Sequence, residues 1–215
     1  ITVYAHDIAK LPSWEQHVWA AYNIVPEGKV SAELLASQVR TQPASTDAVE
    51  DFLFKVMRKL ERDFHQKLDV DLFSYDINDI ELSQQISRFI STDRASLLRL
   101  AKELVRIFTD RLNVKALRNI SNHKDKEKLG SNKLLQDIVA QETGDDNAYK
   151  IFGVIIGVYD MRLGDAHPTS SKIGDALNLA GIDENKSFLR QGEQLISNFG
   201  QAIWHIGQSI FRKSE

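Results

Sequence analysis

The 215-residue chain contains no cysteine, only 4 prolines and only 11 glycines. Without cysteine, a disulfide scaffold, a thiolate zinc site and a cysteine nucleophile are all excluded, and a reducing compartment such as the cytoplasm is the expected location. So few prolines and glycines favour long regular elements over a turn-rich β architecture. No apolar run approaches the roughly 20 residues of a membrane-spanning helix, so we expect no membrane partner.

The chain also lacks a large excess of charge of either sign. The formal net charge is -3 and the isoelectric point is about 6.1, which argues against binding a polyanion through bulk charge. Apolar residues make up 42% of the chain and charged residues 27%, a balance that allows one or two cores. The first residue is Ile rather than Met, which suggests a fragment of a longer protein.

Apolar residues recur at spacings of three and four over most of the chain, and this pattern predicts amphipathic helices. The expected helices cover 11–22, 31–39, 45–68, 79–89, 93–112, a segment from about 131, 147–162, 172–179 and 187–212. Brief extended segments are expected at 1–6 and near 70–72. The predicted fold is all-α: a small helical N-terminal subdomain, residues 1–75, followed by a helical bundle, residues 76–215.

The stretch Arg162-Leu163-Gly164-Asp165-Ala166-His167 is the most informative in the chain. Arg162 continues the apolar stripe of the preceding helix, and a guanidinium in such a position needs an anionic partner. Asp160 and Asp165 are the nearby candidates. Gly164 and Pro168 mark the helix end, which leaves His167 at a helix–loop junction. A fixed cation and a titratable imidazole are therefore expected close together.

These two groups suit phosphodiester chemistry. Histidine exchanges a proton near neutral pH, and arginine holds phosphate oxygens and stabilises charge that grows in the transition state. Cleavage of RNA by its own 2′-hydroxyl requires no metal when both roles are filled.

The Arg-x4-His segment, lying between the penultimate major helix and a long final helix, resembles the HEPN superfamily over about residues 93–212. The resemblance implies a metal-independent endoribonuclease without cofactor, with Arg162 and His167 as the catalytic pair and Asp165 between them. It also implies a homodimer acting on RNA, and a toxin–antitoxin or phage-defence role with an antitoxin as protein partner. Family members often carry a polar residue directly after the arginine, where this chain has Leu163.

A second Arg-x4-His match is formed by Arg118, Asn119 and His123. Asn119 directly after the arginine fits the family pattern better than Leu163 does. This match, however, is followed by the charged segment HKDKEK and does not lie at the end of a bundle helix. It remains a secondary candidate.

The spacing of Asp160, Asp165 and His167 does not place all three on one helix face, so no metal site is expected. Gly153 and Gly157 are expected to allow close helix packing.

The alternative to an enzyme is a non-catalytic helical interaction or dimerisation module of a larger protein, which would hold its partners through apolar helix faces. The acidic isoelectric point and the Ile start favour this alternative.

Overall fold

The computed structural model describes residues 5–21, 48–74, 86–164 and 170–211. These residues form α-helices and short 3₁₀ helices, with one isolated bridge between Phe73 and Leu112, so the expected all-α class is confirmed. In chain order the elements are α1 (Ala5–Ile8), α2 (Ser13–Ala21), α4 (Val49–Leu68), η2 (Arg88–Ile90), α6 (Arg94–Ile107), η3 (Thr109–Arg111), α7 (Val114–Ile120), η4 (Lys126–Lys128), α8 (Ser131–Thr143), α9 (Asp145–Gly164), α10 (Ser170–Leu179) and α11 (Phe188–Phe211).

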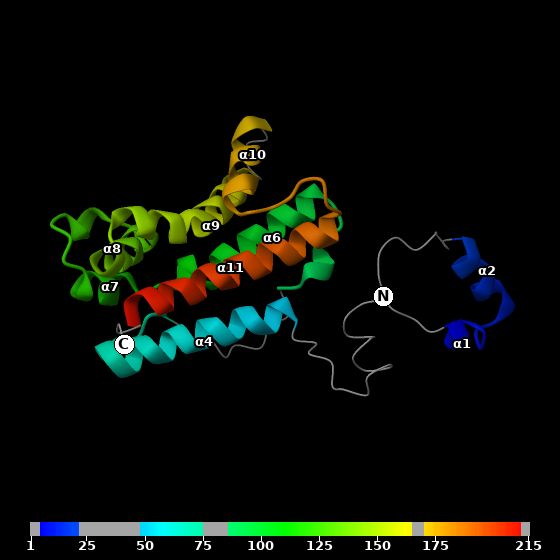
Figure 1. Cartoon of the computed structure of the whole chain (residues 1–215), viewed down its shortest axis with the longest axis horizontal. Coiled ribbons are helices and arrows are strands. Elements are labelled where there is room, and N and C mark those ends of the chain that lie inside the picture. Colours follow the sequence, from blue (N-terminus) through cyan, green and yellow to red (C-terminus); the bar gives the residue numbers. More distant parts are fainter. Residues whose placement is uncertain (1–4, 22–47, 75–85, 165–169, 212–215) are drawn as a thin grey trace. The chain divides into compact units, whose positions relative to one another are not determined.

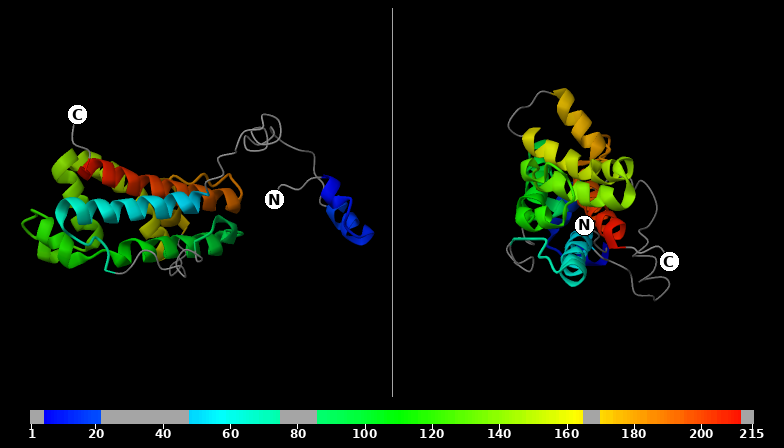
Figure 2. Two further views of the ribbon diagram at one scale, coloured as in Figure 1. Left: turned by 90° about the horizontal axis from the view of Figure 1, so that it is seen from below. Right: turned by 90° about the vertical axis from the view of Figure 1, so that its left-hand side faces the viewer.

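The chain divides into two compact units, Ile1–Thr46 and Asp47–Glu215. Helix α4 belongs to the second unit, because it runs alongside α11 and packs closely against it (Figure 1, Figure 2). The division at residue 46 therefore differs from the expected boundary between residues 75 and 76. The sequence pattern marks where a helix ends, but it does not show which distant helix covers its apolar face.

The first unit contributes α1 and α2. Helix α2 confirms the expected helix at 11–22, but none of its residues is buried, and Trp14 and Trp19 are exposed. Ala5 begins α1, whereas residues 1–4 of the expected first strand lie outside the described residues. The expected helix at 31–39 also lies outside them.

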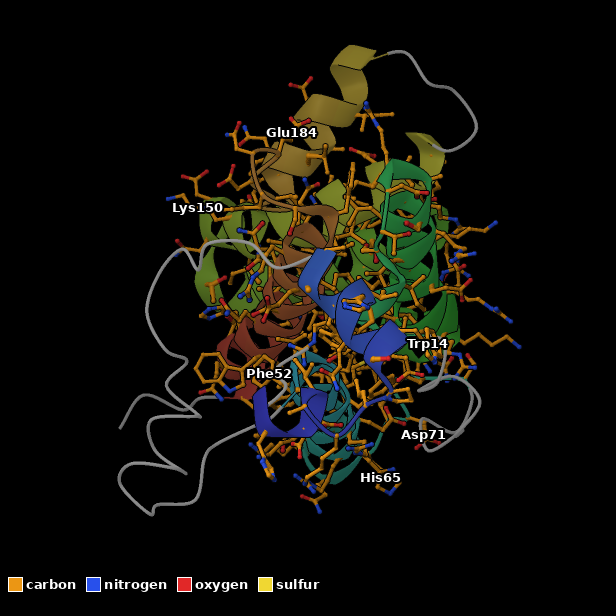
Figure 3. The ribbon with its side chains drawn as sticks, turned by 90° about the vertical axis from the view of Figure 1, so that its right-hand side faces the viewer. Trp14, Phe52, His65, Asp71, Lys150 and Glu184 are labelled. Atoms are coloured by element: carbon orange, nitrogen blue, oxygen red, sulfur yellow. The ribbon has the colours of Figure 1, made fainter. Side chains whose placement is uncertain are left out.

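The second unit is a bundle in which α11 packs against α4, α6, α8 and α9, and α9 packs against α6, α8 and α10. Helix α10 stands at an angle to the others (Figure 1). Edge-to-face contacts join Phe108 at the end of α6 to Phe73 and Phe199, each with 5.7 Å between ring centroids. Phe52 of α4 lies against α11 at Gly200 (Figure 3).

Local capping explains where α6 and α7 begin. The Asp93 carboxylate accepts from the backbone N–H of Ser96 at 2.7 Å, and hydrogen bonds from Ser96 lower the pKa of Asp93. The Asn113 side chain caps α7 by accepting from the N–H of Ala116. Helix α7 was not predicted, and the expected helix at 93–112 ends at Ile107 and continues as η3.

Candidate functional site

Arg162 lies in the last turn of α9 and reaches across to η3. Its Nη1 donates to both carboxylate oxygens of Asp110, at 2.9 Å and 3.0 Å. About a third of the Arg162 side chain remains exposed, compared with 42% for Asp110. Of the two expected partners, the structure describes only Asp160, and Arg162 does not pair with it. Arg162 instead pairs with Asp110, a carboxylate 52 positions earlier in the chain.

Among the described residues, Asp110 binds the guanidinium through one nitrogen, Nη1. Nη2 and Nε of Arg162 make no hydrogen bond to another described residue. On a second side, the Tyr159 ring lies 5.9 Å from Cζ of Arg162, within the range of a cation–π contact. Asp160 is exposed, and partial desolvation raises the pKa of its carboxyl. Asp110 and Tyr159 thus orient Arg162, and no described residue accepts from its Nη2 or Nε.

The other two residues of the first candidate set, Asp165 and His167, lie in the segment 165–169, outside the described residues. The described chain ends at Gly164 on one side of this segment and resumes at Ser170, where α10 begins. The segment that holds His167 therefore begins at residue 165, three positions after Arg162.

In the second candidate set, Arg118 and His123 make different contacts. Arg118 Nη2 donates to the carbonyl of Glu127 at 3.0 Å, and Nη1 lies 3.5 Å from the Glu127 carboxylate. Nε of Arg118 is buried and has no hydrogen-bond partner among the described residues. This arginine therefore closes the turn that contains η4, and Asn119 beside it is exposed.

His123 is exposed. Its Nδ1 accepts from the backbone N–H of Asp125 at 3.0 Å, which leaves the proton of a neutral ring on Nε2. It lines an open groove of about 400 Å³ together with Leu129, Lys133, Gln136, Asp137, Ala140, Asp145, Asp146, Ala148 and Tyr149. Arg118 is not among the residues that line this groove.

Among the described residues, no group of three His, Asp or Glu side chains lies close enough together to hold a metal ion. Of the three residues considered as a metal site, Asp160 is described, whereas Asp165 and His167 lie outside the described residues. In the same described part, no helix is both long enough and apolar enough to cross a membrane.

Asp110 is the site residue that sequence reasoning missed. It lies in a polar turn after a long helix, and nothing in the spacing of residues 109–111 points to residue 162. Only the packing of α9 against α6 brings the two side chains together.

Comparison of the chain with protein-family models, curated proteins and solved structures gave no match. Fold and site together define an all-α bundle with a tethered, partly exposed guanidinium at the end of α9.

Proposed function

We propose that the chain is a metal-independent endoribonuclease that acts through Arg162 and His167. The observation that carries the proposal is the state of Arg162. Asp110 holds one of its nitrogens, a third of the side chain is exposed, and its other donors make no bond to a described residue. An arginine in this state is able to bind phosphate oxygens without first leaving its place in the fold.

In the proposed reaction, His167 takes the proton of an RNA 2′-hydroxyl as O2′ attacks the adjacent phosphorus. The bond from phosphorus to O5′ breaks, and the departing O5′ receives a proton from a water molecule. The products are a 2′,3′-cyclic phosphate and a 5′-hydroxyl. Arg162 stabilises the negative charge that gathers on the non-bridging oxygens. The HEPN resemblance extends the proposal to a homodimer, a cytoplasmic location and a toxin or phage-defence role with an antitoxin partner.

The test uses the purified full chain with single-stranded and structured RNA, with and without chelator. We expect cleavage to persist in chelator. We expect His167→Ala to lower the rate by about 10²- to 10⁴-fold, the usual contribution of acid–base catalysis, with helicity and melting temperature nearly unchanged. Arg162→Gln should lose activity through weaker stabilisation of the phosphate charge.

His123→Ala is the matched control, since His123 is an exposed histidine on the groove between α8 and α9. It should cleave like the parent. Undiminished cleavage by His167→Ala would show that this histidine has no catalytic role, and a parent chain that leaves all RNA intact would refute the nuclease proposal.

A second function, a non-catalytic self-association module, is favoured by the outward face of α9. Tyr149 and Leu163 are 60% and 54% exposed, and the half-buried Ile156 lies midway between them at heptad spacing. Such spacing places the three side chains on one face of the helix. Lys150 projects outward from α9 (Figure 3), and the exposed Asp160 lies toward the other end of the same helix.

The occupant that fits this face is α9 of a second copy, running antiparallel. Centred on Ile156, that arrangement sets Tyr149 opposite Leu163 of the second copy and brings Lys150 close to Asp160. Apolar contacts and opposite charges are then satisfied twice by one twofold axis.

A further inference from the structure

Asp110 lies on a short connector, η3, that joins the end of α6 to the start of α7. Its carboxylate is the acceptor for Arg162, which comes from the far end of α9. The contact therefore bridges two elements that are distant in sequence. Two of the three residues in η3 carry opposite charges, Asp110 and Arg111, and Asp110 is the one that faces Arg162.

The connector is anchored on both sides. Thr109 is buried, its carbonyl accepts from the Ser131 hydroxyl at 3.3 Å, and its own hydroxyl donates to the Asn132 side chain at 3.2 Å. The carbonyl of Arg111 accepts from the N–H of Ser74 at 2.8 Å. Asp110 is thus presented from a backbone that is fixed before and after it.

We propose that Asp110 is a positioning residue for Arg162; this inference rests on the proposed nuclease function. By binding Nη1, Asp110 stops the long side chain from sampling other rotamers and directs Nη2 and Nε toward the place where a phosphodiester binds. The Tyr159 ring restricts the guanidinium on a second side. The same carboxylate offsets part of the arginine charge, so it weakens the attraction of Arg162 for RNA in the ground state. It still holds the guanidinium in the orientation that the transition state needs.

These two effects predict changes in both kcat and KM when Asp110 is substituted. An ion pair that only joined α9 to η3 would not produce these changes. Asp110→Asn keeps the shape and removes the charge. We expect kcat to fall by about 10- to 100-fold because orientation is lost. We expect KM for RNA to stay equal or to decrease, because the uncompensated arginine attracts the phosphate more strongly. Asp110→Glu, which restores the charge, should recover part of kcat.

The control is Asp125→Asn, which removes another exposed carboxylate that pairs with a cation, here Lys128. It should leave kcat and KM unchanged. All variants should keep a melting temperature close to that of the parent, because partly exposed ion pairs contribute little to stability.

A second readout is independent of cleavage. In nitrogen-detected NMR of the full chain, tethering to Asp110 should slow rotation of the Arg162 guanidinium and resolve its Nη signals, and Asp110→Asn should average them. Averaged signals in the parent would show that the tether is absent and overturn the inference alone. So would an active parent whose Asp110→Asn variant has the same kcat and KM. An inactive parent would overturn the nuclease function together with the inference.

Discussion

At the scale of single residues, Gly157 of α9 lies directly against the backbone at the end of α10. A Cβ atom at this position would lie 2.6 Å from the Ala180 nitrogen and 2.7 Å from the Ala176 oxygen. Both are backbone atoms, which cannot move away as the end of a flexible side chain does. The expected close packing is therefore confirmed for Gly157, whereas a Cβ at Gly153 would have no neighbour within 4 Å.

The two glycines thus form a matched pair on one helix. We expect Gly157→Ala to lower the free energy of unfolding by about 1–3 kcal/mol, because the added methyl group forces α9 and α10 apart. Gly153→Ala should raise it by about 0.5–1 kcal/mol, because alanine favours the helix and meets no obstacle. Urea unfolding followed by circular dichroism measures both. Equal effects of the two substitutions would contradict the close approach at Gly157.

At the scale of one element, α9 presents different surfaces along its length. Its inner side chains, among them Phe152, Ile155 and Val158, are fully buried, while Tyr149 and Leu163 are exposed. Singly exposed apolar side chains are normal on a protein surface. The proposal of self-association rests on Tyr149 and Leu163 lying on one face of α9.

Under the self-association proposal, Leu163→Arg should convert the proposed dimer to a monomer in light scattering over a concentration series, because each dimer would place two cations against the Tyr149 side chains. Since Leu163 is 54% exposed, the arginine remains solvated in the monomer, and the melting temperature of the monomer should not change. Leu68→Arg at the end of α4, another exposed leucine, is the control and should leave the mass unchanged. A monomeric parent would exclude self-association through α9.

At the scale of the whole molecule, the decisive contact is the pairing of α4 with α11. Helix α4 buries six large apolar side chains: Leu53, Phe54, Val56, Met57, Leu60 and Phe64. Each contributes about 1.5–3 kcal/mol when fully buried, so their joint contribution exceeds the net stability of many domains. The bundle therefore depends on a helix that the sequence pattern assigned to the preceding subdomain.

Two truncations test this dependence. A chain of residues 47–215 should fold and unfold in one cooperative transition, since it keeps the whole compact unit. A chain of residues 76–215 should show no cooperative transition and should aggregate, because the face of α11 that packs on α4 becomes exposed. Differential scanning calorimetry measures both. Cooperative melting of the shorter chain would show that the bundle folds without α4 and would support a domain boundary near residue 75.

The sequence was sufficient to predict the all-α class and the main helices, including those at 45–68, 147–162 and 187–212. Spacings of three and four are local properties, and each helix carries its own apolar stripe. The same reasoning missed α7, since its seven residues are too few for a recognisable period. The Arg162 motif was likewise visible in the sequence, because its residues are neighbours in the chain.

The partner of Arg162 and the place of α4 depend on contacts between residues that are far apart in sequence. Asp110 precedes Arg162 by 52 positions, and no local pattern predicts that they meet. An amphipathic stripe shows that a helix face must be covered, but any apolar surface can cover it, so the choice of α11 for α4 is made by how all the helices pack together.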